Sequence, residues 1–155
     1  MTTYAELCCA TNFSFLRGGS HAEELVMQAQ HLGLCALAVT DINTFSGIVR
    51  AHGAAKDQSL QFIVGVRLEL DDFTLFAWPT TRKAYGRLCR LLSLGQRRAE
   101  KGKCLLTFED VLSHAEGSIF ALPHDDGAHV GRVAAELKAP LYYMLSARYD
   151  GHDRA

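Results

Sequence analysis

Two segments of the chain place polar side chains directly after predicted strands, where an α/β protein would hold a metal ion or a substrate. The apolar segment 3–9 predicts a strand that leads into Thr11, and the apolar segment 35–40 predicts a strand that ends at Asp41. Barrels of alternating strands and helices build their sites at the carboxyl ends of the strands. Asp41 is therefore the first candidate for metal-dependent or acid–base chemistry.

Other imidazole and carboxylate groups follow later elements of the chain. The residual candidates for a metal or a catalytic rim are Asp41, His52, His124, Asp125, Asp126 and His129. Residues 123–126, Pro-His-Asp-Asp, follow a predicted strand, which would place them on the rim with Asp41. The alternative is a turn in which Asp125 or Asp126 caps a helix that begins at Gly127, and the sequence favours this interpretation. His52, beside Arg50 in a predicted helix, is interpreted as a packing or surface residue.

The two polar segments also carry a family resemblance. Residues 4–19, YAELCCATNFSFLRGG, and 39–52, VTDINTFSGIVRAH, resemble the first two motifs of the PHP (polymerase and histidinol phosphatase) domain, in the form that opens bacterial error-prone DNA polymerases. An active member of that family reads His-x-His-Ser and then Thr-Asp-His. The corresponding positions here hold Cys8, Ala10 and Thr11, and then Thr40, Asp41 and Ile42.

The resemblance implies a site that hydrolyses phosphoesters with divalent metals, and most of its ligands are replaced in this chain. Arg17 stands at an aspartate position, Ile42 at a histidine position and Arg67 at a glutamate position. Cations at anion positions should repel metals, so we expect no metal cofactor; bound Mn, Zn or Mg is the alternative. We also expect Arg17 or Arg67 to form a buried salt bridge with Asp41 in place of the metals.

The cysteines do not restore a metal site. Cys8 and Cys9 are adjacent in a predicted strand, so their side chains point to opposite faces. We therefore interpret them as buried thiols rather than soft zinc ligands. The chain has five cysteines, an odd number, and they are irregularly spaced along the sequence. This pattern is expected for reduced thiols in a cytoplasmic protein.

The elements that position these residues alternate between strands and helices. Strands are predicted over 3–9, 35–40, 62–70, 73–78, 118–122 and 141–145, and helices over 20–33, 45–56, 81–96, 107–114 and 127–137. Capping boxes at Ser20/Glu23 and at Thr107/Asp110 mark two of the helix starts. The first helix is expected to bury Leu25, Ala29 and Leu32 and to stop at Gly33. This order predicts an α/β fold with mainly parallel strands.

The PHP resemblance sharpens the fold prediction. It implies a distorted (β/α)7 barrel, of which about six strands are predicted here. Residues 149–155, YDGHDRA, look like a family segment that leads into a further helix. We therefore expect residues 1–155 to be a single partial PHP domain, the N-terminal fragment of a larger polymerase. The remainder of the barrel and the polymerase domains would lie outside it.

Bulk properties fit one globular domain and exclude several classes of protein. The chain has 155 residues, 48% of them hydrophobic, and a net charge of −1, so only a local patch can attract a polyanion. Its longest apolar runs fall far short of the ~20 residues of a membrane-spanning helix. The start, MTTYAEL, lacks a signal sequence. We expect a cytoplasmic protein without a membrane partner.

One such local patch lies in the segment 82–103. Eight cations, against the single acid Glu100, occur there: Arg82, Lys83, Arg87, Arg90, Arg97, Arg98, Lys101 and Lys103. The spacing of Lys83, Arg87 and Arg90 predicts one cationic helix face. The possible DNA or partner contacts are Lys83, Arg87, Arg90, Arg97, Arg98 and Lys101. A solvated face that keeps the protein soluble is the other interpretation.

Together these features favour a non-catalytic PHP module of an error-prone DNA polymerase, acting in translesion synthesis and DNA repair. Its partners would be the rest of the polymerase chain and, through segment 82–103, DNA. The alternatives are a metal-dependent phosphoesterase or 3′–5′ exonuclease, and an orphan adaptor or decayed fragment.

Overall fold

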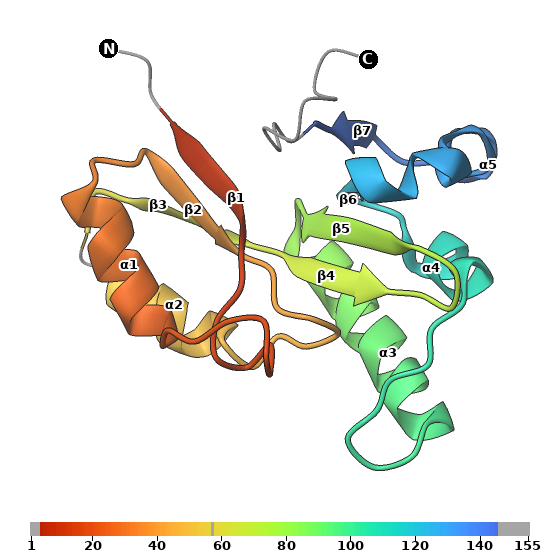
Figure 1. Cartoon of the computed structure of the whole chain (residues 1–155), viewed down its shortest axis with the longest axis horizontal. Coiled ribbons are helices and arrows are strands. Elements are labelled where there is room, and N and C mark those ends of the chain that lie inside the picture. Colours follow the sequence, from red (N-terminus) through yellow and green to blue (C-terminus); the bar gives the residue numbers. More distant parts are fainter. Residues whose placement is uncertain (1–3, 57, 146–155) are drawn as a thin grey trace.

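The computed structural model describes residues 4–56 and 58–145 of the chain. Its elements alternate much as the sequence predicts (Figure 1). They are β1 Ala5–Cys9, α1 Ala22–His31, β2 Ala36–Val39, α2 Ile48–Ala55, β3 Gln61–Val64, β4 Val66–Glu69, β5 Thr74–Pro79, α3 Arg82–Arg98, α4 Phe108–His114, β6 Ser118–Pro123, the 3-10 helix η1 His124–His129, α5 Val130–Glu136 and β7 Leu141–Met144. The prediction for residues 149–155 lies outside the described residues.

The strands form two sheets. The first has the order β1-β2-β3 and is entirely parallel. The second has the order β4-β5-β6-β7, and in it β5 runs antiparallel to both neighbours while β7 is parallel to β6. The α/β class is therefore confirmed, but the second sheet is mixed rather than mainly parallel. In the described residues β1 and β7 are sheet edges that do not pair with each other, so closure into a barrel stays a prediction.

Gly65 marks the junction between the sheets. The single strand expected over 62–70 is wrong, because the chain divides there into β3 and β4. A Cβ atom on Gly65 would lie 2.6 Å from Thr40 Cγ2 and 2.7 Å from Trp78 Cδ1, so only glycine allows this approach. The extension of β2 then bridges to β4, with Arg67 N donating to Asp41 O over 3.1 Å. This junction brings β4 beside the end of β2.

Two apolar cores support the sheets. The first lies between the parallel sheet and helices α1 and α2, and the second between the mixed sheet and helices α3, α4 and α5 (Figure 1). Helix α1 buries Ala22, Val26 and Ala29. Ala29 is confirmed and Leu25 is half-buried against the same core, whereas Leu32, predicted to be buried, is 63% exposed. The buried alanines of α1 meet small residues on α2, which lets the two helices pack closely.

The helix ends follow the predicted chemistry with one shift. Gly33 ends the first helix with a positive φ of 69°, as expected. Its start is one residue later than predicted, because Glu24 Oε2 accepts from His21 N over 2.7 Å, rather than Glu23 pairing with Ser20. The second capping box is confirmed, since Thr107 and Asp110 bond reciprocally at the start of α4. Within the described part of the chain, no helix has the length and apolar character needed to cross a bilayer.

Candidate functional site

Asp41 is the centre of a buried hydrogen-bond cluster at the carboxyl ends of β1 and β2. These strands are parallel neighbours, so the loops that follow them meet at one edge of the sheet. Asp41 Oδ1 accepts from Thr11 N at 2.8 Å and from Ser14 Oγ at 2.6 Å, and Oδ2 accepts from Thr11 Oγ1 at 2.8 Å. Thr11, Ser14 and Asp41 are each no more than 1% exposed. We call these three residues the Asp41 cluster.

The same hydroxyl groups also order the surrounding backbone. Ser14 Oγ accepts from Ile42 N over 3.0 Å, and Thr11 Oγ1 accepts from Phe13 N over 3.1 Å. Gly18 closes the first loop against Thr11, where a Cβ atom would lie 2.2 Å from Thr11 O. Every side-chain oxygen of the cluster thus bonds within the protein, and these bonds tie the loops after β1 and β2 together.

The predicted salt bridge to Asp41 is wrong. Among the described residues, neither Arg17 nor Arg67 forms an ion pair with this carboxylate. Arg67 instead lies 3.4 Å from Glu69 Oε1 and 5.9 Å from the ring centroid of Phe76, its cross-strand partner. Both oxygens of Asp41 are already occupied by closer hydroxyl and amide donors. Thr11 occupies the serine position of the first family motif, and Ser14 follows three residues later. Their hydroxyl groups were the sequence feature that could have identified the partners of Asp41.

The described residues include the positions that match the family's metal motifs. Within residues 4–56 and 58–145, no three His, Cys, Asp or Glu side chains gather closely enough to hold an ion. Burial, with a smaller effect of Glu6, raises the pKa of the Cys8 thiol to about 12, and burial also raises the pKa of Cys9. Both thiols are therefore protonated near neutral pH. The described motif positions thus offer Cys8, Ala10, Ile42 and Arg67 where the family implies charged or imidazole ligands.

The second group of candidates, on η1, makes separate contacts. His124 Nδ1 lies 3.1 Å from the hydroxyl of Tyr143, and the ring of His129 stacks on Phe73 at 4.7 Å. Asp126 Oδ2 accepts from Thr74 N over 3.1 Å. The expected cap at Gly127 is wrong, because a 3-10 helix begins at His124 and neither it nor α5 has a side-chain cap. Asp125, His124 and Asp41 do not form a metal-binding group.

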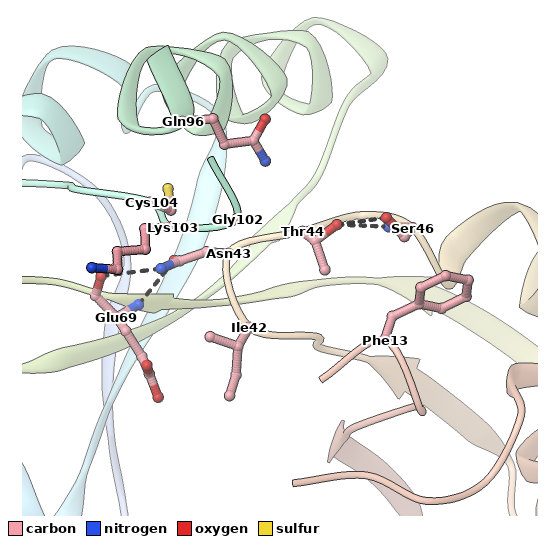
Figure 2. Close-up of a pocket in the computed structure, with 10 residues that line it drawn as sticks. All are labelled: Phe13, Ile42, Asn43, Thr44, Ser46, Glu69, Gln96, Gly102, Lys103 and Cys104. Atoms are coloured by element: carbon pink, nitrogen blue, oxygen red, sulfur yellow. Dashed lines mark hydrogen bonds between the residues drawn. The ribbon is translucent and has the colours of Figure 1, made fainter. Parts of the chain in front are cut away.

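Two cavities open near the sheet junction. A polar cavity of about 660 Å³ is lined by Phe13, Ile42, Asn43, Thr44, Ser46, Glu69, Gln96, Gly102, Lys103 and Cys104 (Figure 2). Asn43 spans its floor by bonding both N and O of the Glu69 backbone, at 3.1 and 3.3 Å. A second, apolar groove of about 420 Å³ is lined by Leu7, Cys8, Ile63, Trp78, Ile119, Ala121, Tyr142 and Met144. This groove touches both edge strands, β1 and β7.

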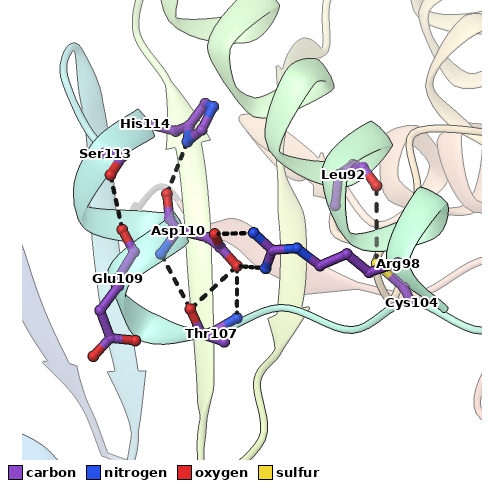
Figure 3. Close-up of polar contacts among 8 residues, drawn as sticks. All are labelled: Leu92, Arg98, Cys104, Thr107, Glu109, Asp110, Ser113 and His114. Carbon is purple, nitrogen blue, oxygen red and sulfur yellow. Dashed lines mark hydrogen bonds and ion pairs between the residues drawn. The ribbon is translucent and has the colours of Figure 1, made fainter.

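The basic segment divides into paired and unpaired cations. Arg87 Nη2 lies 2.5 Å from Glu116 Oε2, and Lys103 Nζ lies 2.9 Å from Glu100 Oε2. Arg98 donates two hydrogen bonds, of 2.5 and 2.9 Å, to the carboxylate of Asp110 (Figure 3). The exposed cations with no ion pair to any described residue are Arg82, Lys83, Arg90, Arg97 and Lys101.

Asp110→Asn is expected to destabilise the fold by about 1–2 kcal/mol near neutral pH, because Asp110 both caps α4 and binds Arg98 (Figure 3). The Arg98 hydrogen bond is the main cause of the lowered pKa of Asp110. A lowered folded-state pKa contributes stability above the unfolded value, about 3.9, and this is lost as pH falls through the folded value. Thermal melts should therefore converge for the two proteins below about pH 4. A gap that persists in strong acid would contradict this origin.

Comparison with known proteins gives two kinds of relative. The PHP domain family matches residues 6–152. A protein named error-prone DNA polymerase from Caulobacter vibrioides is 46% identical over 97% of the chain, and error-prone DNA polymerase 1 from Agrobacterium fabrum is 48% identical over 97%. The chain spans only 15% and 14% of the lengths of these two relatives.

Solved structures of low sequence identity share the fold. A proposed metal-dependent phosphoesterase from Bifidobacterium adolescentis superposes with a TM-score of 0.70 at 12% identity, over 92% of this chain and 77% of that one. An amidohydrolase from Chromobacterium violaceum, solved with bound SO4 and no metal, gives 0.64 at 14% identity, over 90% and 76%. These likenesses concern the fold alone.

Proposed function

The chain belongs to the PHP domain family, and from that premise we propose that it is a non-catalytic PHP module of an error-prone DNA polymerase. The observation that carries the proposal is the Asp41 cluster. Asp41 occupies a metal-motif position, yet its carboxylate is enclosed by three donors from Thr11 and Ser14. Three of the roughly four acceptor sites of this carboxylate are thus taken by protein donors, and the residue is 1% exposed, which supports a structural role for it.

The remaining motif positions support the same proposal. Metal-assisted hydrolysis needs ions that lower the pKa of water and neutralise phosphoryl oxygens. Cys8 and Ile42 offer no charged ligand, and Arg67 adds a positive charge beside them. In this proposal hydrogen bonds replace metal bridges as the link between the loops after β1 and β2. The module would act as a scaffold within a cytoplasmic polymerase that serves translesion synthesis and DNA repair.

The scaffold role has a surface that suits it. The apolar groove reaches from Leu7 on β1 to Tyr142 and Met144 on β7, and both strands are sheet edges in the described part of the chain. Exposed edges and apolar grooves favour association unless another segment covers them. We propose that further parts of the polymerase chain cover this groove. The relatives support this, because the chain matches only about 15% of their length.

The test is metal content and phosphodiesterase activity of the purified chain, by elemental analysis and an assay supplemented with manganese or zinc. We expect no stoichiometric metal, no turnover and no change in melting temperature when EDTA is added. Asp71→Ala, at an exposed turn position, is the control for Asp41→Ala. One or more bound metals, with activity that Asp41→Ala abolishes and Asp71→Ala keeps, would instead establish the competing function, phosphoester hydrolysis.

The same preparation separates the scaffold from an orphan adaptor. A scaffold whose groove is normally covered should self-associate when isolated, and size-exclusion chromatography would show it. A monodisperse monomer that binds no apolar dye would speak for a self-sufficient adaptor.

A further inference from the structure

Helix α3 carries a straight row of exposed cations. Lys83, Arg90 and Arg97 are spaced seven residues apart, and this spacing drifts by only about 20° per step around a helix. At 1.5 Å per residue the row is about 21 Å long. The opposite side of the helix, with Leu88 and Leu91, is buried in the core of the mixed sheet. We call Lys83, Arg90 and Arg97 the α3 row.

The acids around α3 do not neutralise this row. Glu116, Asp110 and Glu100 are taken by Arg87, Arg98 and Lys103, and no acid in residues 4–56 or 58–145 forms an ion pair with the α3 row. The face predicted from sequence included Arg87, but the structure draws that side chain to Glu116. The row therefore keeps a local positive charge on a chain whose net charge is −1.

Small side chains lie beside the cations of the α3 row. Gly86 and Ser93 lie on the same side of the helix as the row, three residues after Lys83 and Arg90. A Cβ atom on Gly86 would meet nothing within 4 Å, so packing does not require this glycine, although it weakens the helix relative to alanine. The Ser93 hydroxyl donates back to Cys89 O over 2.8 Å and adds no protruding donor. A ligand backbone can thus approach α3 closely along the flank of the row formed by Gly86 and Ser93, whereas Arg87 and Leu94 lie on the other flank.

We infer that the α3 row binds the phosphodiester backbone of DNA. Repeated single positive charges along a line fit an extended polyanion, and each arginine can pair with a phosphate through two N–H groups. Protein interfaces need an apolar centre, and no large hydrophobic side chain of α3 is exposed. Nucleic-acid interfaces are instead polar and positively charged. The choice of DNA rests on the proposed polymerase function, whereas the row itself is independent of the metal site.

The test is fluorescence anisotropy of labelled single-stranded and primer–template DNA titrated with the chain at several salt concentrations. About three phosphate contacts predict a slope of log K against log salt of roughly −2 to −3. Arg90→Glu/Arg97→Glu should weaken binding about tenfold or more at low salt and reduce the slope to about −1. Lys56→Glu/Lys138→Glu is the matched control, because it changes the net charge equally at exposed positions outside the row. Its affinity should stay within about threefold of the parent chain.

A second variant does not depend on charge. Gly86→Gln should raise the melting temperature, because it removes a helical glycine, and yet weaken DNA binding several-fold by filling the space between the cations. The inference is overturned if the folded chain does not bind DNA at low salt, if both charge variants weaken binding equally, or if Gly86→Gln leaves the affinity unchanged. Binding of polyglutamate as tight as that of DNA, lost in the row variant, would assign the surface to an acidic protein and also overturn it. Each result is separate from metal content, which tests the proposed function.

Discussion

Asp41→Asn is expected to lower the free energy of unfolding by about 1–3 kcal/mol, because the change removes one of the two acceptor oxygens that hold three buried hydrogen bonds. The asparagine amide keeps one acceptor oxygen but turns an NH2 group toward the donors of Thr11 or Ser14. A buried donor left without a partner costs about 1–3 kcal/mol. Whole domains are stable by only about 5–15 kcal/mol, so a loss of this size is a measurable fraction of the total. Urea denaturation measures the loss.

The control is Asp71→Asn, at an exposed turn position, which should change stability by less than about 0.5 kcal/mol. A double-mutant cycle between Asp41→Asn and Ser14→Ala tests the mechanism further. The two residues share one hydrogen bond of 2.6 Å, so their losses should not add. Additive losses, or a loss below about 1 kcal/mol for Asp41→Asn, would mean that the cluster does not hold the loops together.

The sequence predicted the parts of this site that depend on local chemistry. Both polar segments were expected just past the carboxyl ends of strands, and in the structure Thr11 and Asp41 follow β1 and β2 and bond to each other there. Motif positions also drew attention to Asp41. What could not be predicted was its partner, because charge alone favoured an arginine. The hydroxyl of Ser14 prevails because it sits on the adjacent loop with a short reach, whereas Arg67 is directed toward Phe76 by its strand.

The fold departs from prediction where distant parts of the chain meet. Residues 62–70 read as one apolar strand, and only the approach of Thr40 and Trp78 explains the break at Gly65. Helix α1 shows the same effect. The predicted face of Leu25, Ala29 and Leu32 is right for Ala29 and for the half-buried Leu25. Packing against the small residues of α2 adds Ala22 and Val26 in place of the exposed Leu32. The periodic spacing of apolar residues shows that a helix has a buried side, and packing against the neighbouring element decides which residues form that side.

Gly47→Ala is expected to destabilise the chain by about 1–3 kcal/mol through direct overpacking of the Asp41 cluster. A Cβ atom there would lie 2.6 Å from Asp41 Oδ2 and 3.0 Å from Thr11 Oγ1. The backbone of Gly47 has φ −75° and ψ −18°, which alanine adopts freely, so backbone strain does not contribute. Thermal or urea denaturation would measure the loss. In an Asp41→Asn background the penalty should shrink, since the clustered bonds are already weakened.

Gly53→Ala gives the matched comparison within the same helix. A Cβ atom on Gly53 meets nothing within 4 Å, so this substitution should stabilise the chain by about 0.5–1 kcal/mol through helix propensity alone. The two glycine substitutions therefore carry opposite signs, although they add the same methyl group six residues apart. Equal effects would show that the space around Asp41 can relax. Opposite effects would mean that the Asp41 cluster is packed too tightly on its Gly47 side to admit even one methyl group.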